Sequence, residues 1–398
     1  MSEQHLMNTY GRQPIAIERG EGSWLYDSNG NKYFDSISGI AVCGLGHCHN
    51  AVTDAMIQQA QKLVHCSNLY NIPVQAQLAE RLAEVSGMEQ IFFSNSGAEA
   101  NEAAIKLARY YGHKKGIPQP KVIVAENAFH GRTLATLSAT GNRKVQAGFE
   151  PLVKGFVRVP FNDIAAIKSV AEANNEIVAV LLEPIQGEGG VNVPDGAYLR
   201  EVRQICSDQK WLMMLDEVQT GNGRCGAYFA FQRLGIKPDV VTTAKGLGNG
   251  FPIGACLASG NAVDVFTPGS HGSTFGGNPL ASAVALAVIN TIESQELAQR
   301  ATVLGRRILD QLNAEFANAH YIRQIRGMGL MIGIEMSSPC AELAALAKTQ
   351  GLLLNVTSDK VIRLLPPLTM TDEEAEFLVN TLVRLIKIYA GDDRKAPR

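Results

Sequence analysis

Hydrophobic residues in the middle of the chain occur in short continuous runs, and segments with helical patterns separate these runs. Such runs end in polar or small residues at IFFSNSG (91–97), KVIVAEN (121–127), IVAVLLEP (177–184), WLMMLDE (211–217) and DVVTTAK (239–245). They lack the alternation of a strand with one exposed face, so we expect both faces to be covered. Buried strands between helices predict an α/β fold with a mostly parallel sheet sandwiched by helices.

The two ends of the chain have a different pattern. SWLYDSNGNKYFD (23–35) predicts a hairpin with its turn at residues 28–30. Beyond about residue 290, a long helix, IRGMGLMIGIEM (325–336), further short apolar segments and an amphipathic helix over 372–390 predict a smaller α+β unit. We therefore expect a large domain over residues 49–289, and a small domain built from residues 1–48 and 290–398.

The composition is that of an ordinary globular protein, with 46% hydrophobic and 19% charged residues among 398. The formal net charge of −2 gives no reason to expect nucleic acid or an anionic membrane as a partner. Seven cysteines without a CxxC pair are typical of free thiols in a reducing compartment. No signal segment or membrane-spanning run is evident, and we expect a cytoplasmic protein.

One lysine stands alone in a long uncharged segment. Between Asp239 and Asp264, the residue with a charged side chain is Lys245, at the junction of an apolar strand and a Gly-rich turn. A buried lysine gives up its proton readily and can then act as a nucleophile. Asp216 ends the preceding apolar strand, so the two groups are expected at the same edge of the sheet. The simpler interpretation of Asp216 is a turn-forming acid.

A second group of residues suits a phosphate. Ser96, Gly97 and Ala98 precede a helix that we expect to begin near Glu99. The free backbone N–H groups and the positive dipole end of a helix attract a phosphate. The same residues also match a capping box, Ser96-x-x-Glu99, which needs no ligand. Both interpretations stay open at this point.

Together these groups match pyridoxal phosphate (PLP). Its phosphate suits the helix end, its aldehyde suits Lys245, and its pyridine nitrogen needs a carboxylate partner such as Asp216. Phe129 stands at another strand end and could stack on the flat ring, although core packing explains it equally well.

Two other motifs are weaker. GNGRCG (221–226) has the GxGxxG spacing, but it does not directly follow a strand or open a helix, so no nicotinamide or flavin site is expected. Cys43, His47, Cys48 and His49 could suggest zinc. A tight turn explains GLGHCHN more simply, because no second ligand pair is evident, and we expect no metal.

The motifs GHCH, SNSGAEANEAAIKLAR, AFHGRT, EPIQGEGGV, LDEVQTGNGRCG, AKGLGNGFPIGA and GSTFGGNPLA occur in this order. With them, the chain resembles the class III, ornithine-type aminotransferases of PLP fold type I, from GSWLYDSNGNKYFD to VIRLLPPLTMTDEE. The resemblance implies that Lys245 carries the covalent link to PLP and that Asp216 pairs with its pyridine nitrogen. Val218 and Phe129 would pack on the two faces of the ring, and Gln219 would bind its hydroxyl.

The resemblance also implies a shared active site. Gly97 and Ala98, next to Ser96, would bind the phosphate through backbone amides. Thr274 of the partner subunit would reach the same phosphate, with Ser273 near the substrate. The family therefore implies a homodimer in which each site is built from two chains.

The resemblance also implies how the substrates are bound, by one arginine for a shared carboxylate and by an arginine–glutamate pair that responds to the second carboxylate. Arg132 would bind the distal carboxylate of both substrates in a ping-pong reaction. Glu188 would neutralise Arg363 while an ω-amine donor is bound, and Arg363 would bind the α-carboxylate of glutamate or 2-oxoglutarate. The alternative for this pair is an ordinary salt bridge.

Ile40 stands where ornithine aminotransferases have a tyrosine that helps to recognise the free α-amine. An apolar residue favours a donor whose α-amine is acylated. We therefore expect transfer of the ω-amino group of N2-acetyl-L-ornithine to 2-oxoglutarate, as in arginine biosynthesis, giving N-acetyl-L-glutamate 5-semialdehyde and L-glutamate. N-succinylornithine, N-succinyl-diaminopimelate and ornithine are alternative donors.

Two other classes of function compete with a transaminase. One is a different PLP chemistry, such as decarboxylation, and the other is a non-enzymatic binding protein.

Overall fold

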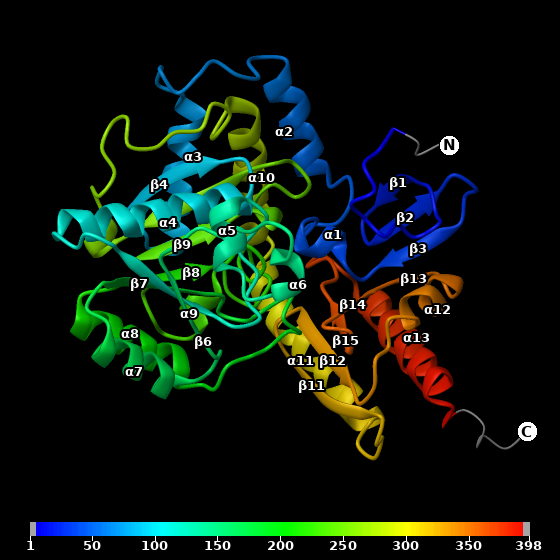
Figure 1. Cartoon of the computed structure of the whole chain (residues 1–398). Helices are drawn as coiled ribbons and strands as arrows, with labels where there is room; N and C mark the ends of the chain where they lie inside the picture. Colours follow the sequence, from blue (N-terminus) through cyan, green and yellow to red (C-terminus); the bar gives the residue numbers. More distant parts are fainter. Residues whose placement is uncertain (1–4, 393–398) are drawn as a thin grey trace, which may run out of the picture.

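The structure, a computed structural model, describes residues 5–392, and a seven-stranded sheet forms its centre (Figure 1). The strand order is β4 (Gln90–Ser94), β10 (Gly254–Ala258), β9 (Val240–Thr243), β8 (Leu212–Asp216), β7 (Ile177–Leu182), β5 (Lys121–Ala125) and β6 (Phe156–Val159). Neighbouring strands are parallel except at β10, which is antiparallel to both β4 and β9. The predicted mostly parallel sheet is therefore confirmed.

Helices connect these strands and cover the sheet. They are α2 (Asn50–Ala60), α3 (Pro73–Ser86), α4 (Gly97–Lys114), α5 (Leu134–Ala139), α6 (Arg143–Gln146), α7 (Ile164–Ala173), α8 (Tyr198–Gln209), α9 (Ala230–Arg233) and α10 (Pro279–Ser294), with 3-10 turns η1 (Lys245–Leu247) and η2 (Gly260–Ala262). None of the helices within residues 5–392 combines the length and the apolar character that crossing a bilayer requires.

The continuous apolar runs arise because each strand contributes to two cores. All of β7, β8, β9 and β10 is buried. Leu212 and Met214 belong to the core cluster that contains Ala104 of α4. Met213, between them, belongs to the cluster that contains Val202 of α8. Successive side chains thus enter opposite helix layers, which is why β7 and the first four residues of β8 are apolar at every position.

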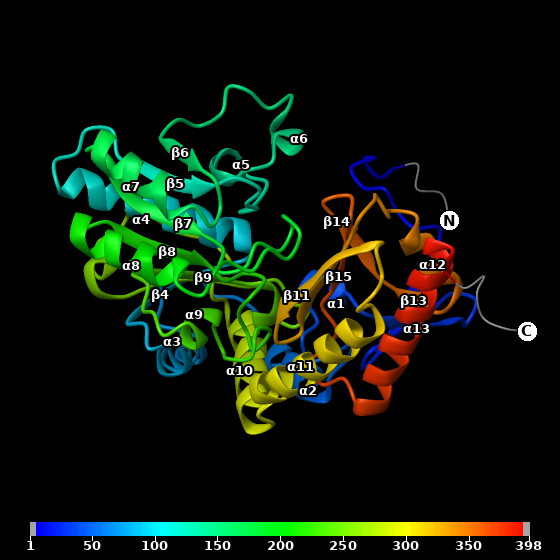
Figure 2. The same ribbon diagram turned by 90° about the horizontal axis from the view of Figure 1, so that it is seen from below.

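The two ends of the chain build two smaller sheets. One has the order β1 (Ile17–Glu21), β2 (Trp24–Asp27), β3 (Lys32–Asp35) and β13 (Leu352–Leu353), and the other β11 (Ile322–Met328), β12 (Met331–Met336), β15 (Val361–Leu364) and β14 (Asn355–Thr357). The remaining helices are α1 (Ser38–Ala41), α11 (Leu297–Glu315), α12 (Leu343–Thr349) and α13 (Asp372–Ala390). In Figures 1 and 2 the blue amino-terminal strands lie with the orange and red carboxyl-terminal elements, beside the central sheet.

Specific contacts join the predicted hairpin to the final helix. The β2–β3 hairpin is present, and Asp27 accepts the backbone N–H groups of Asn29 and Asn31 within its turn. Glu374 completes a capping box at the start of α13. Its carboxylate also accepts the Trp24 indole N–H at 2.7 Å. The division at residues 48/49 and 289/290 remains a prediction, and α10 continues through residue 289 without a break.

Candidate active site

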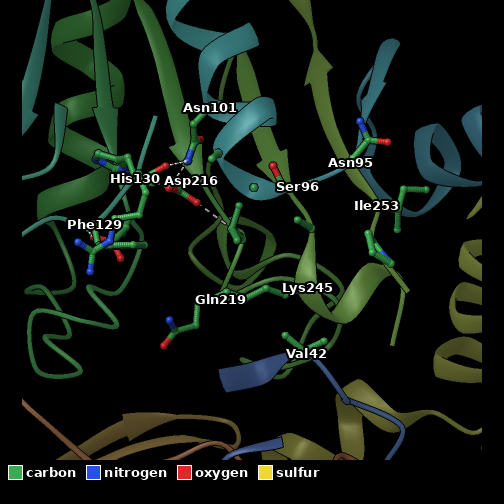
Figure 3. A pocket seen from close by; sticks show the side chains of 18 of the residues that line it. Val42, Asn95, Ser96, Asn101, Phe129, His130, Asp216, Gln219, Lys245 and Ile253 are labelled. Carbon is green, nitrogen blue, oxygen red and sulfur yellow. Dashed lines mark hydrogen bonds and ion pairs between the residues drawn. The ribbon is translucent and has the colours of Figure 1, made fainter. Parts of the chain in front are cut away.

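The tertiary structure brings the predicted lysine, carboxylate, aromatic ring and helix end to one cavity of about 430 Å³. Asp216 ends β8, and Lys245 follows β9, which is the hydrogen-bonded neighbour of β8. Phe129 follows β5, and Gly97 begins α4. The close view in Figure 3 shows these segments converging around the cavity. It lies at the carboxyl-end edge of the parallel strands, where ligands bind in open α/β sheets.

Lys245 is half-buried and begins η1 with a φ of +46°, in the left-handed region. Such a conformation is costly for a residue with a side chain and is found preferentially at functional sites. Burial lowers the pKa of the Lys245 amine, the charge of Arg363 lowers it further, and the carboxylate of Glu188 opposes both effects. The amine is therefore suited to a neutral state in which it can accept a proton.

Asp216 is buried, and one of its two carboxylate oxygens accepts two hydrogen bonds. Its Oδ2 accepts hydrogen bonds from Asn101 Nδ2 at 2.7 Å and from His130 Nδ1 at 2.8 Å. Its Oδ1 accepts the backbone N–H of Val218 at 3.0 Å. Asn101 and His130 also line the cavity, and neither was predicted from the sequence. A signal existed for Asn101, which follows Gly97 by one helical turn and shares its helix face.

The first turn of α4 combines the two interpretations of its motif. Ser96 is the N-cap, and its Oγ accepts the backbone N–H of Glu99 at 3.2 Å. The Glu99 carboxylate accepts the N–H of Asn95 at 2.6 Å and not that of the N-cap Ser96, so the Ser96 cap is present but the reciprocal half of the predicted capping box is not. The helix begins at Gly97, slightly earlier than expected. The N–H groups of Gly97 and Ala98 belong to the first turn and have no intrahelical acceptor, so an anion can still bind them.

Two side chains flank the space between the helix end and Asp216. A Cβ on Gly97 would lie only 2.7 Å from Val218 Cγ1, so α4 approaches Val218 as closely as a glycine allows. Phe129 is half-buried on another side of the cavity. The exposed guanidinium of Arg132 lies 5.7 Å from the centre of the Phe129 ring. A flat ligand between Val218 and Phe129 would therefore have Arg132 nearby, at the rim of the cavity.

The Glu188–Arg363 pair forms beside the cavity. Arg363 is completely buried, and its Nη1 donates to Glu188 Oε1 at 2.5 Å and to Gln219 Oε1 at 3.1 Å. Burial alone would raise the pKa of Glu188, but the adjacent guanidinium lowers it below its usual value. Nη2 of Arg363 has no hydrogen-bond partner among residues 5–392. Gln219 lines the cavity, so the pair stands directly behind the cavity wall.

Besides Glu188 and Arg363, three more predicted residues do not line the cavity of a single chain. Ser273 lies just outside it, and its Oγ accepts a hydrogen bond at 3.1 Å from Asn95, which does line the cavity. Thr274 is exposed. Ile40 is 40% exposed and adopts a φ of +66° in the turn before Val42, another lining residue.

Two buried glutamates near the site accept hydrogen bonds from backbone N–H groups. Glu183 lines the cavity, and its carboxylate accepts the N–H groups of Phe129 and Gly187 at 3.0 and 3.2 Å. Burial raises its pKa to about 7. Glu217, next to Asp216, accepts the N–H groups at residues 230 and 231 at 2.8 Å and so caps α9.

The cysteine- and histidine-rich turn holds an ion pair. His47 Nε2 lies 2.8 Å from Asp35 Oδ2. Burial alone would lower the pKa of His47, but Asp35 and Cys43 raise it to about 10. Within the part of the chain that the structure describes, no group of His, Cys, Asp and Glu side chains is arranged to hold a metal ion.

Residues 6–386 match the model of the class III aminotransferase family. The chain belongs to the class III aminotransferases. This aminotransferase is 55% identical over 382 residues to the acetylornithine aminotransferase of Nitrosomonas europaea, covering 96% of this chain and 97% of that one.

Solved structures of the family share its fold. An ornithine aminotransferase of Toxoplasma gondii, with PLP at partial occupancy in its active site, matches with a TM-score of 0.95 at 34% identity, covering 99% of this chain and 94% of that one. The acetylornithine aminotransferase of Elizabethkingia anophelis matches with a TM-score of 0.87 at 34% identity, covering 96% of each chain.

Class III aminotransferases use PLP. The residues around the cavity fit this group. Lys245 supplies an amine for the aldehyde, and the first turn of α4 supplies N–H donors for the phosphate. Asp216 Oδ1 accepts a single hydrogen bond and keeps a lone pair for a protonated pyridine nitrogen.

Proposed function

We propose that this chain is an acetylornithine aminotransferase that uses PLP. It would transfer the ω-amino group of N2-acetyl-L-ornithine to 2-oxoglutarate, giving N-acetyl-L-glutamate 5-semialdehyde and L-glutamate. The observation that carries the proposal is the convergence of Lys245 and Asp216 on one cavity with the Glu188–Arg363 pair behind its wall. The 55% identity to an acetylornithine aminotransferase over nearly the whole chain supports the choice of substrate.

When bound, PLP supplies an aldehyde that accepts the amino group and a protonated ring that withdraws electrons from the reacting carbon. Asp216 would accept the N–H of the pyridine ring through Oδ1 and so keep that nitrogen protonated. Lys245 Nζ, neutral because burial lowers its pKa, would remove the proton from the substrate carbon and return it during transfer. Val218 and Phe129 would hold the ring between them.

Two arginines would recognise the substrates. Arg132, exposed at the rim, would bind the carboxylate that both substrates carry far from the reacting carbon. Arg363 would bind the α-carboxylate of 2-oxoglutarate or glutamate. With acetylornithine bound, no carboxylate lies next to the reacting carbon, and Glu188 would neutralise Arg363 through the ion pair that the structure contains. This alternation lets one pocket accept two differently charged substrates.

Ile40 supports an acylated donor. Its apolar side chain lies in the turn next to Val42, which lines the cavity. The ammonium of free ornithine would find no acceptor on this side chain, whereas an acetylated nitrogen carries no charge.

We propose further that the enzyme is a homodimer with shared active sites. In a single chain, Thr274 is exposed and the neighbouring Phe275 is 60% exposed. An exposed phenylalanine beside a predicted phosphate ligand supports a loop that contacts a second copy. Thr274 of the partner subunit would then complete the phosphate site. Size-exclusion chromatography with light scattering tests the dimer, and a monomer with full activity would contradict it.

The deciding experiment is a comparison of kcat/KM for acetylornithine, succinylornithine and free ornithine, each with 2-oxoglutarate. We expect acetylornithine to be used well and free ornithine at least about tenfold less well, because an unpaired ammonium is disfavoured in the pocket. A preference for free ornithine would overturn the substrate assignment. The absence of transamination with all three donors would overturn the proposed function itself.

A further inference from the structure

The orientation of the Asn101 side chain is fixed by its neighbours. Its Nδ2 donates to the carbonyl of His130 at 2.8 Å and to Asp216 Oδ2 at 2.7 Å. Its Oδ1 accepts the hydroxyl of Thr242 at 2.6 Å. A carbonyl and a carboxylate can only accept, so the NH₂ group must face them, and the amide cannot be flipped without loss. Asn101 and Thr242 are both 1% exposed, so water cannot replace these bonds.

This arrangement determines how Asp216 is presented to the cavity. Asn101 and His130 occupy both lone pairs of Oδ2. The N–H of Val218 occupies one lone pair of Oδ1. The lone pair that remains belongs to Oδ1, and with Oδ2 held by two donors the carboxylate cannot rotate to offer a different one. Figure 3 shows Asn101 and His130 at Asp216, with Lys245 farther along the cavity.

A single helix sets the distance between the two ends of the cofactor site. Gly97 begins α4 at the predicted phosphate end, and Asn101 lies one turn further on the same face. Asn101 contacts Asp216 on β8 and Thr242 on β9, and these two residues are direct partners in the sheet. The phosphate cradle and the carboxylate are therefore fixed to the same rigid element.

We propose that Asn101 and Thr242 are positioning residues that aim Asp216 Oδ1 at the pyridine nitrogen of PLP. Thr242 holds the amide of Asn101, and Asn101 holds the carboxylate. This inference rests on the proposed function, because it assumes that Asp216 pairs with that nitrogen. It assigns to the Asn101 position of the SNSGAEANEAA motif a role separate from phosphate binding.

The test compares binding of PLP with binding of its 1-deaza analogue, in which a C–H group replaces the pyridine nitrogen. Apo-protein is titrated with each compound, and the ratio of the two dissociation constants reports the contribution of the nitrogen alone. The variants are Asn101→Leu, which is close in size, and Thr242→Val, in which a methyl group replaces the hydroxyl. Thr242→Ser restores the hydroxyl. Thr291→Val is the control, because Thr291 is also buried and loses a hydrogen bond within α10, away from the site.

We expect the wild-type protein to bind PLP more tightly than the analogue. In Asn101→Leu and Thr242→Val this preference should fall about tenfold or more, which is the usual effect of a lost hydrogen bond to a charged group. Affinity for the analogue should change by less than about twofold, and Thr242→Ser should recover the preference. The Thr291→Val control should keep the wild-type ratio even if its melting temperature falls.

Other outcomes overturn the inference in distinguishable ways. If the variants bind both compounds equally less well, Asn101 and Thr242 have a general structural role and the positioning assignment is wrong. If the wild-type protein itself shows no preference for PLP, then Asp216 does not pair with the nitrogen, and that part of the proposed function fails as well. Should Asn101→Leu fail to fold, the milder Thr242→Val decides the question by the same ratio.

Discussion

The Glu188–Arg363 pair permits a sharp test of substrate recognition through Glu188→Gln. The glutamine keeps an oxygen that can accept from Arg363 Nη1 but removes the negative charge. Arg363 is completely buried, whereas the Glu188 side chain is 32% exposed, so the pair lies between a surface pair and a buried one. Surface pairs contribute about 0–1 kcal/mol and breaking buried ones costs about 3–5 kcal/mol, so we take about 2 kcal/mol here. That value corresponds to about a 30-fold change in rate or affinity.

The decrease in kcat/KM that Glu188→Gln causes should be confined to the half-reaction with acetylornithine. Among residues 5–392, Glu188 is the carboxylate paired with Arg363, and acetylornithine places none of its own there, so kcat/KM for this half should fall about 30-fold. With glutamate, the substrate carboxylate binds Arg363, so this half should change by less than about threefold. Single-turnover absorbance spectra of the cofactor, recorded with each substrate alone, separate the two halves.

Glu188→Gln should also shift the acid limb of the pH–rate profile. Burial lowers the pKa of Lys245, and the Glu188 carboxylate partly opposes that effect. Without the carboxylate the pKa falls further, so the amine stays neutral to lower pH. The acid limb of the glutamate half-reaction should therefore move to lower pH in Glu188→Gln.

A matched control separates recognition from general stability. Asp239→Asn disrupts another partly buried pair, in which Asp239 Oδ2 lies 2.6 Å from Arg203 Nη1, at the opposite end of β9 from Lys245. We expect this control to lower the melting temperature without distinguishing between the halves. Equal losses in both half-reactions of Glu188→Gln would show that Glu188 and Arg363 form an ordinary salt bridge, and the proposed alternation would have to be abandoned.

Three further substitutions test the remaining roles. Lys245→Ala should abolish turnover yet still bind PLP without a covalent link, as borohydride reduction followed by mass spectrometry would show; full activity would refute its role. Arg132→Ala should raise KM for both substrates about tenfold or more, because both place a carboxylate there, and an effect on one alone would contradict the assignment. In Gly97→Ala the new Cβ would meet Val218 Cγ1 at 2.7 Å, so PLP should bind about tenfold less tightly. Gly196→Ala, where nothing lies within 4 Å, should leave PLP binding unchanged.

Much of the fold could be predicted because its signals are local. A strand covered on both faces is apolar along most of its length, and residues 177–182 of β7 and 212–215 of β8 show this in the sequence alone. The polar residue that ends such a strand is placed at the edge of the sheet by the same rule. For this reason Asp216 and Lys245 could be identified as candidates without knowing the order of the strands.

The residues that support Asp216 are marked less clearly in the sequence, because the spacing of Asn101 from Gly97 shows only that the two share a helix face. Asn101 lies within a helix and His130 within a loop, and each is a common polar residue when its neighbours are unknown. Their contacts with Asp216 span 115 and 86 positions of the chain, so no local pattern reveals them. Glu183 and Glu217 both lie at the ends of apolar runs and look alike in the sequence. In the structure, Glu183 lines the cavity, whereas Glu217 caps α9.

Periodicity and strand-end residues are properties of neighbouring positions, so the buried strands, the residues at their ends and the family resemblance of the motifs could all be predicted from the sequence. That β8 and β9 lie side by side, so that Asp216 and Lys245 share a cavity, is seen only once the strands are assembled into the sheet. The same holds for the contact between Glu188 and Arg363, which are 175 positions apart. Strand order and long-range pairing depend on how whole elements pack against one another, and no short window of residues contains that information.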